Sequence, residues 1–283
     1  MLDYPKKVYL NGQILATDNA KVSIFDRGFL FGDGIYEVMV QINGRFFYEK
    51  AHLDRLQSCL QKVEITFDVN SLQKVIPDLL TASSLSDTDC LLYIQITRGV
   101  APRQHSFPKK IKPTVLLYAI PKKLPDTNEI HTSVITENDF RWGRCDIKMT
   151  SLLGNVMANE LAIKNDCFET LLVRDGIITE ASHCNVFFVK DDIVFTYPAN
   201  NFILNGITRQ IVFELCQKLN IEIREEGIRL ENIKEMSEAF LVGTSTQIAP
   251  IKKLDGHIFY ADSNIGRVTA KLQLAFLELK RSF

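Results

Sequence analysis

The sequence predicts an α+β protein of two domains, and three observations support that prediction. Three pairs of short apolar segments are each separated by Asn-Gly or Asp-Gly, the pattern of an antiparallel hairpin. Segments with apolar residues at helical spacing lie among these pairs, without the strict strand–helix alternation of a doubly wound sheet. A polar segment with two prolines, residues 121–126, divides the chain.

The three predicted hairpins turn at Asn11-Gly12, Asn43-Gly44 and Asp175-Gly176. These residue pairs tolerate the positive φ angles of a tight turn. We expect strands on both sides of each turn, and β-branched and apolar content predicts further strands elsewhere. The expected strands span residues 8–10, 13–15, 38–42, 45–48, 91–97, 114–120, 170–173, 177–179 and 239–242.

Three helices are predicted where apolar side chains recur three or four residues apart. They run from Leu53 to Val63, from Leu152 to Leu161 and from Ile207 to Leu219. The elements and the proline-containing segment together predict a small N-terminal α+β domain at residues 1–120, a linker at 121–126 and a larger C-terminal domain at 127–283. The chain has 283 residues, 46% of them apolar, which is enough to build a core in each domain.

Charge and hydropathy exclude two classes of partner. The formal net charge is −1, so there is no basic excess to neutralise a nucleic-acid backbone. The basic run at residues 109–112 is interpreted as a solvated loop. No apolar run approaches the roughly 20 residues that span a bilayer. The first seven residues lack the apolar core of a signal peptide, so we expect a cytoplasmic protein.

Neither the six cysteines nor any common catalytic motif indicates a function. No Cys-x-x-Cys pair and no histidine at zinc-ligand spacing is present, so we expect reduced thiols and no metal site. Cys145, three residues before Lys148, is either packing or part of a site. There is no P-loop, no His-Glu-x-x-His and no Gly-x-Ser-x-Gly, and Gly32-Asp33-Gly34 lacks the third glycine of a dinucleotide fingerprint.

Six segments together carry a stronger signal than any one of them. In their order and spacing they resemble the class IV, or fold-type IV, aminotransferases over nearly the whole chain, and within that family they are most similar to the D-amino-acid transaminases. The segments are Asp26–Glu37, His52–Leu56, Thr97–His105, Arg144–Lys148, Thr179–Phe187 and Gly206–Arg209. The resemblance implies pyridoxal 5'-phosphate (PLP) bound between a small N-terminal and a larger C-terminal domain.

Lys148 is the lysine that the resemblance assigns to the Schiff base with the cofactor. Such an amine must also move protons, which requires a pKa lowered by burial or by nearby cations. Lys148 lies beside apolar residues and before a predicted helix. Its local sequence is equally compatible with a surface lysine, so the assignment comes from the family.

The resemblance also assigns the cofactor's other partners. Glu180 matches the carboxylate that keeps the ring nitrogen protonated, and Arg55 matches a bidentate phosphate ligand. Taken alone, Glu180 could be a solvated strand-end residue and Arg55 could pair with its neighbour Asp54. Leu204 matches a leucine that packs on the ring. Phosphate donors are expected in two further places, which are the helix start at Ile207 and Thr208 and the turn at Thr244 and Ser245.

The substrate carboxylate requires a cationic partner, and the loop after the strand 91–97 offers one. Arg103 and His105 resemble the carboxylate trap of D-amino-acid transaminases, in which Tyr36 completes the trap. In the family this loop comes from the neighbouring subunit, so a homodimer is implied. His183 departs from the serine-rich turn of the family. It is either a determinant of side-chain preference or a surface histidine.

The predicted reaction is therefore a ping-pong transfer of the amino group from D-amino acids, such as D-alanine or D-glutamate, to 2-oxo acids. Sibling reactions on the same fold remain alternatives, namely those of a branched-chain L-aminotransferase, an (R)-amine transaminase or an aminodeoxychorismate lyase. A non-catalytic PLP-binding protein is the alternative from a different class.

Overall fold

The computed structural model describes residues 4–126, 132–262 and 265–283. Within these residues the chain forms two compact units. Unit 1 contains the chain up to Leu124, together with Ile147–Leu152 and Phe283, and unit 2 contains Pro125–Asp146 and Leu153–Ser282. The chain passes from one unit to the other inside the proline-containing segment 121–126. Ile147–Leu152 belongs to unit 1 although it lies beyond that segment, so Lys148 is a unit 1 residue.

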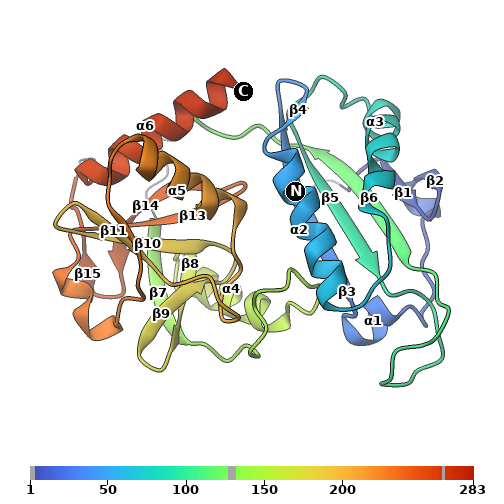
Figure 1. Cartoon of the computed structure of the whole chain (residues 1–283), viewed down its shortest axis with the longest axis horizontal. Coiled ribbons are helices and arrows are strands. Elements are labelled where there is room, and N and C mark those ends of the chain that lie inside the picture. The colour runs from blue at the N-terminus through green and yellow to red at the C-terminus, as the bar shows by residue number, and fades with distance from the viewer. Residues whose placement is uncertain (1–3, 127–131, 263–264) are drawn as a thin grey trace. The chain divides into compact units, whose positions relative to one another are not determined.

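Unit 1 is built on an antiparallel sheet of six strands in the order β2-β1-β6-β5-β3-β4, drawn in blue to green in Figure 1. Its predicted strands are found, with small differences at their ends. The strands are β1 Lys7–Leu10, β2 Gln13–Ala16, β3 Gly34–Ile42, β4 Arg45–Phe46, β5 Cys90–Thr97 and β6 Thr114–Pro121.

The hairpin turns have the backbone that their residues favour. Asn11 and Gly12 have φ angles of 50° and 97°, and Asn43 and Gly44 have 51° and 76°. The strand expected at 45–48 is shorter than predicted and ends at Phe46. The reason is Tyr48, which has a left-handed φ of 55° and therefore cannot continue a strand. The helix α2 begins directly after it.

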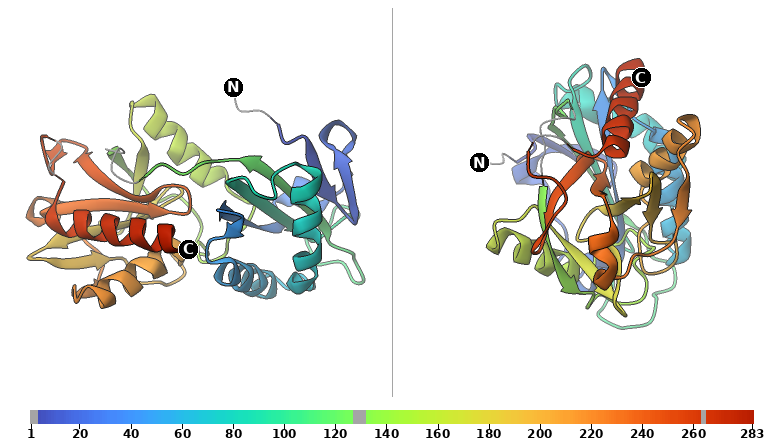
Figure 2. Two further views of the ribbon diagram at one scale, coloured as in Figure 1. Left: turned by 90° about the horizontal axis from the view of Figure 1, so that it is seen from above. Right: turned by 90° about the vertical axis from the view of Figure 1, so that its left-hand side faces the viewer.

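Two helices cover one face of this sheet, as both Figure 1 and Figure 2 show. The predicted helix 53–63 is α2, Glu49–Lys62, and α3 spans Leu72–Ala82. Leu56 of α2 and Leu79 of α3 are fully buried against the strands. Shorter helical segments are α1 Arg27–Phe31, η1 Thr17–Asn19 and η2 Val69–Ser71.

Unit 2 is built on a larger sheet in the order β12-β11-β10-β13-β14-β7-β8-β9, with β15 paired to β14. Most neighbouring strands are antiparallel, while β11·β12, β14·β7 and β7·β8 are parallel. The strands are β7 Thr132–Asn138, β8 Glu169–Arg174, β9 Ile177–Ala181, β10 Asn185–Lys190, β11 Ile193–Thr196, β12 Ile223–Glu225, β13 Glu238–Gly243, β14 Gln247–Leu254 and β15 His257–Ile258.

The helices of unit 2 lie on both faces of its sheet. α4, Leu153–Lys164, packs on β7 and β8, whereas α5, Ile207–Lys218, and α6, Arg267–Ser282, pack on β13 and β14. Figure 2 shows α4 in yellow-green on one side and α6 in red on the other. The 3-10 helix η4 spans Leu230–Glu235. The predicted helices 152–161 and 207–219 are thus found, and the α+β prediction is confirmed.

The cysteines and the helices of the described residues bear on disulfides and on membrane-crossing length. All six cysteines are free, and four of them are buried, at positions 59, 90, 184 and 216. Cys145 is half-buried, with its thiol directed at the carbonyl of Trp142, and burial raises the pKa of that thiol to about 11. In the described part of the chain, no helix combines the length and apolar character that a bilayer crossing requires.

Candidate active site

Lys148 is held in unit 1 by a strand-like pairing with the beginning of β3. The amide of Tyr36 donates to the carbonyl of Lys148 at 3.0 Å, and the amide of Thr150 donates to the carbonyl of Gly34 at 2.9 Å. Ile147 and Met149 point into the core of unit 1, so alternation along this segment turns Lys148 to the other side. Its Nζ lies 3.3 Å from the Tyr36 hydroxyl and 4.3 Å from the centre of that ring.

Tyr36 is itself fixed by other aromatic residues of the sheet. Its ring stacks on Tyr93 of β5, with ring centres 5.7 Å apart, and Tyr93 stacks on Tyr118 of β6 at 4.9 Å. The Tyr93 hydroxyl donates to Gln95 at 2.7 Å. Stacked rings on three adjacent strands leave the Tyr36 phenol little freedom, so its hydroxyl is presented to the Lys148 amine in one orientation.

A buried ion pair lies directly beside Tyr36. The guanidinium of Arg55 on α2 donates from Nε and Nη2 to the two carboxylate oxygens of Glu37, at 2.8 and 2.7 Å. His52 adds a third contact to that carboxylate at 3.0 Å. Burial would raise the pKa of Glu37, but Arg55 and His52 outweigh burial and hold this pKa well below its usual range. Glu37 is therefore a permanent carboxylate that orients Arg55.

The sequence left a surface pair between Arg55 and Asp54 as an alternative, and the structure does not bear it out. Asp54 accepts from Lys50 at 2.6 Å, and both of these side chains are largely exposed. The Arg55 side chain is only 12% exposed and pairs with Glu37, because its place on α2 turns it toward β3. The partner that sequence reasoning missed is Glu37. The residue lies inside a family-like segment, but its sequence context gave no sign of a role.

Arg103 and His105 lie together in the loop between β5 and β6, on a shared aromatic platform. The ring of Phe31 lies 5.0 Å from the Arg103 guanidinium carbon and 5.8 Å from the His105 ring centre. Arg27, buried and paired with Asp33 at 2.7 Å, donates to the carbonyl of Gln104 at 2.6 Å. This contact anchors the loop between the two predicted carboxylate ligands, which are themselves exposed.

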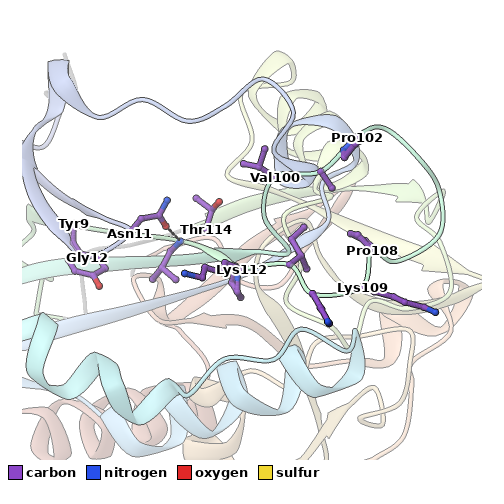
Figure 3. A pocket seen from close by; sticks show the side chains of 14 residues that line it. Tyr9, Asn11, Gly12, Val100, Pro102, Pro108, Lys109, Lys112 and Thr114 are labelled. Atoms are coloured by element: carbon purple, nitrogen blue, oxygen red, sulfur yellow. Dashed lines mark hydrogen bonds between the residues drawn. The ribbon is translucent and has the colours of Figure 1, made fainter.

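The base of this loop is closely packed. Gly99 has φ +108°, and a Cβ at this position would lie 2.0 Å from the Lys112 carbonyl oxygen. A hollow of about 760 Å³ lies beside the loop base, and Figure 3 shows Val100 and Pro102 on one strand of the loop and Lys109 on the other. None of the predicted site residues lines this hollow. It is a feature of the loop base and does not coincide with Lys148.

In unit 2, Glu180 is 5% exposed and held by three donors. Arg141 donates to one carboxylate oxygen at 2.7 Å, while the Asn185 side chain and the Leu204 amide donate to the other, each at 3.1 Å. Burial outweighs these contacts and raises the pKa of Glu180 to about 7. The interpretation as a solvated strand-end residue is wrong, because Glu180 lies within β9 and faces the interior.

Arg141 and Asn185 are the two residues around Glu180 that sequence reasoning did not assign. Asn185 lies in a family-like segment and also donates to the Leu204 carbonyl at 2.9 Å. Arg141 lay outside every recognised segment, and only the fold brings it to Glu180. Its Nε donates to Asp139 at 2.9 Å, which fixes the guanidinium from behind.

The predicted phosphate donors of unit 2 lie at a helix start and at a strand turn. α5 begins at Ile207 as expected, and the side chains of Ile207 and Thr208 are buried, which leaves backbone N–H groups at the helix start as the available donors. A Cβ on Gly206 would lie 2.3 Å from the Asn185 side-chain oxygen, so this position requires glycine. Thr244, half-buried, and Ser245, exposed, form the turn between β13 and β14.

His183 is neither a simple surface residue nor a buried one. Its side chain is 52% exposed, yet its Nδ1 lies 2.6 Å from Oε1 of the fully buried Glu169. Burial lowers the pKa of His183, but contacts with Cys184 and Glu169 outweigh burial and raise it to about 11. His183 is therefore an imidazolium at neutral pH.

Each unit thus contributes a distinct set of groups. Unit 1 holds the Lys148 amine beside the Tyr36 phenol, the largely buried Arg55 guanidinium, and the exposed side chains of Arg103 and His105. Unit 2 holds an enclosed carboxylate, a helix start and a hydroxyl-bearing turn. An amine beside a phenol can move a proton, and a fixed guanidinium or a helix start can bind an anionic group.

Known proteins resemble the chain in sequence over almost its whole length. The family model described as amino-transferase class IV matches residues 34–254. The D-alanine aminotransferase of Staphylococcus epidermidis strain RP62A is 37% identical over 274 residues, covering 95% of this chain and 96% of that protein. The D-alanine aminotransferase of Listeria monocytogenes serotype 4b is 36% identical over 278 residues, covering 96% and 95%.

Solved structures resemble the chain in fold. The branched-chain amino acid aminotransferase of Escherichia coli superimposes with a TM-score of 0.88 at 22% identity, covering 98% of this chain and 95% of that one. The branched-chain aminotransferase of the thermophilic archaeon Thermoproteus uzoniensis, solved with norvaline, has a TM-score of 0.84 at 23% identity, covering 98% and 95%. At these identities the likeness establishes the fold.

Proposed function

The chain belongs to the class IV aminotransferases, and on that premise we propose that it transfers the amino group of D-amino acids to 2-oxo acids. The cofactor of the family is pyridoxal 5'-phosphate. Similarity to D-alanine aminotransferases over nearly the full length supports D-alanine and D-glutamate as donors. The observation that carries the proposal is the Lys148 amine beside the Tyr36 phenol, in the same unit as the Arg103 and His105 loop.

The residues present fit this cofactor. Glu180 is an enclosed carboxylate whose three donors hold it in one orientation, as a partner for a protonated ring nitrogen requires. When bound, pyridoxal 5'-phosphate supplies a carbonyl that accepts the amino group and a ring that withdraws electrons from the substrate Cα.

Lys148 is proposed to bind the cofactor covalently and to move the proton. Its amine would take the proton from the substrate Cα and hold it for return during the transfer of the amino group. The Tyr36 hydroxyl at 3.3 Å supports the amine during this exchange. Because donor and acceptor use the same site in turn, we expect ping-pong kinetics.

Phosphate binding is proposed to involve Arg55, the α5 start at Ile207 and Thr208, and the Thr244-Ser245 turn. Glu37 keeps Arg55 in place through its two short hydrogen bonds. Leu204, whose amide donates to Glu180, is proposed to pack on the cofactor ring.

Substrate orientation is proposed to come from Tyr36, Arg103 and His105. A guanidinium and a phenol together hold an α-carboxylate in one orientation, which selects one configuration at Cα. We propose that the Arg103 loop serves the site of a neighbouring subunit, so the working form is a homodimer. The exposure of both loop residues, with their backbone anchored by Arg27, supports this assignment. The cytoplasmic location stays a prediction.

One assay compares D-alanine, L-alanine, L-leucine and an (R)-amine as donors to 2-oxoglutarate. The proposal expects D-alanine to be used with a kcat/KM well above that of every other donor. Preference for L-leucine or for the (R)-amine would replace it with the corresponding sibling reaction, and release of pyruvate from aminodeoxychorismate would indicate the lyase. A protein that binds the cofactor but turns over no donor would be a non-catalytic binder.

A further inference from the structure

A cluster of three potential metal ligands lies in unit 2, apart from the residues assigned to transamination. Glu169 is the first residue of β8, while His183 and Cys184 occupy the turn between β9 and β10. Their ligand atoms, a carboxylate oxygen, an imidazole nitrogen and a sulfur, all lie within 4.8 Å of one another. From this geometry we propose that Glu169, His183 and Cys184 form a binding site for Zn²⁺.

The turn brings two adjacent residues to the same point. The amide of Ala181 donates to the carbonyl of Cys184 at 2.8 Å and closes a tight turn. As a result His183 and Cys184 both approach Glu169, although neighbours in an extended strand would point to opposite faces. Ligands bound to one tetrahedral zinc ion are separated by roughly 3.4–3.7 Å. The cluster is near this size, but His183 Nδ1 and Glu169 Oε1, now 2.6 Å apart, must separate by about 1 Å to admit the ion.

Hydrogen bonds to one carboxylate oxygen of Glu169 fix the orientation in which the second oxygen could bind zinc. Its Oε2 accepts from the Ser182 hydroxyl at 2.6 Å, from the Ser182 amide at 3.2 Å and from the Thr170 amide at 3.0 Å. Its Oε1 meets His183, through the amide at 3.1 Å and Nδ1 at 2.6 Å. One oxygen is thus held by the backbone and a hydroxyl, while the other faces the imidazole.

The ligand set favours zinc over the common hard cations. Thiolate and imidazole suit Zn²⁺, whereas Ca²⁺ and Mg²⁺ require oxygen ligands throughout. Three protein ligands leave one position for water, and the exposed His183 gives the ion access from solvent. Binding replaces the proton shared by His183 and Glu169, so at least one proton is released as the metal enters.

Cys184 also has support from a neighbouring element. Its sulfur lies 3.2 Å from the Thr246 hydroxyl, at the end of the Thr244–Thr246 turn. A hydroxyl beside a sulfur ligand can donate to the thiolate and so orient it. The proposed ion therefore lies next to, and not within, the turn proposed to bind phosphate.

The test measures zinc binding by the purified holoenzyme in competition with a chromophoric chelator. We expect one zinc ion per chain, and an affinity weakened by at least about 100-fold after His183→Ala or Cys184→Ser, since changes to residues that only support a ligand typically cost less. The matched controls, His257→Ala and Cys167→Ser, alter a histidine and a cysteine of the same unit outside the cluster and should bind zinc like the wild type. No stoichiometric binding, or equal affinity in all variants, overturns the site.

X-ray absorption at the zinc edge provides a second readout that needs no variant. We expect one sulfur at about 2.3 Å and lighter ligands at about 2.0 Å. A spectrum without sulfur overturns the proposal even if Cys184→Ser fails to fold. Neither measurement depends on turnover, so this proposal and the transaminase proposal can fail independently.

Discussion

At the scale of single residues, Lys148 and Glu180 acquire their character from their surroundings. The Lys148 amine is placed beside Tyr36, a residue 112 positions away in the chain, by backbone pairing with β3. Glu180 is enclosed by Arg141, Asn185 and the Leu204 amide. Fixed partners orient both side chains, and for Glu180 burial also raises the pKa of the carboxyl.

Lys148→Ala should remove both covalent cofactor attachment and turnover. Loss of a positioned proton-transfer group alone costs about 10²–10⁴-fold in rate. Mass spectrometry after borohydride reduction should find the cofactor on the peptide that contains residue 148 in the wild type and on no peptide of the variant. A variant that keeps both the adduct and its activity would remove Lys148 from the mechanism.

Glu180 predicts a pH dependence of stability in the cofactor-free protein. Its pKa rises from 4.5 to about 7 on folding, so the folded state holds the proton more tightly. The contribution of Glu180 to the free energy of unfolding is fully present below pH 4.5 and is lost as the pH rises through 7. The free energy of unfolding of the wild type, relative to Glu180→Gln, should therefore fall by on the order of a few kcal/mol over that range. Denaturant titrations at several pH values measure it, and a constant difference would contradict the raised pKa.

At the scale of elements, the buried pair of Glu37 and Arg55 joins β3 to α2. Two short hydrogen bonds and the contact with His52 link a strand and a helix directly beside Tyr36. Removing one member of such a pair leaves the other buried without its counter-charge. The pair is therefore expected to hold α2, and with it the proposed phosphate ligand, in a fixed register against the sheet.

Glu37→Gln should lower the free energy of unfolding by about 3–5 kcal/mol, since the Arg55 charge loses its partner in the interior. Asp54→Asn on the same helix is the matched control. It removes an exposed pair with Lys50 and should cost under about 0.5 kcal/mol. Urea unfolding of the three proteins checks both values, and equal losses would mean that the buried pair contributes no more than a surface one.

The shape of the loop between β5 and β6 is fixed by contacts at its base and at its middle. Gly99 permits the close approach of the two ends of the loop, and Arg27 holds the middle through the Gln104 carbonyl. Phe31 lies under Arg103 and His105. The loop therefore has a defined shape while the side chains of Arg103 and His105 stay exposed, which suits the ligand-binding role that we propose for it.

At the scale of the whole molecule, we propose that the Arg103 loop serves the site of a second chain. Arg103→Leu should bind the cofactor but lose about 10- to 150-fold in kcat/KM for D-alanine, the cost of one charged hydrogen bond. Lys148→Ala should be inactive. If the loop acts across the dimer, each site takes Lys148 from one chain and Arg103 from the other.

Mixing these two variants under conditions that exchange subunits tests that arrangement. A hybrid dimer would contain one site with intact Lys148 and intact Arg103, and random exchange should restore about a quarter of wild-type activity. Mixing Lys148→Ala with the double variant, which has no intact lysine, should restore none. If the loop served its own subunit, the first mixture would also recover nothing, and sedimentation should show two chains per particle in either case.

Local sequence was sufficient to predict most elements and the family. Asn-Gly and Asp-Gly predicted the hairpins, Gly206 predicted the start of α5, and apolar spacing predicted three helices. These signals work because turns, caps and amphipathic faces depend on residues only a few positions apart. The ordered motifs identified a class IV aminotransferase, and the family match confirmed it.

The partners of the site residues, in contrast, followed only from the folded chain. Glu37 with Arg55, Arg141 with Glu180 and Glu169 with His183 are separated by 18, 39 and 14 residues. The fold also placed Ile147–Leu152 in unit 1. Such contacts depend on strand register and on the direction in which each side chain leaves the backbone. Periodicity and turn signals describe neither, since both extend only over the next few residues along the chain.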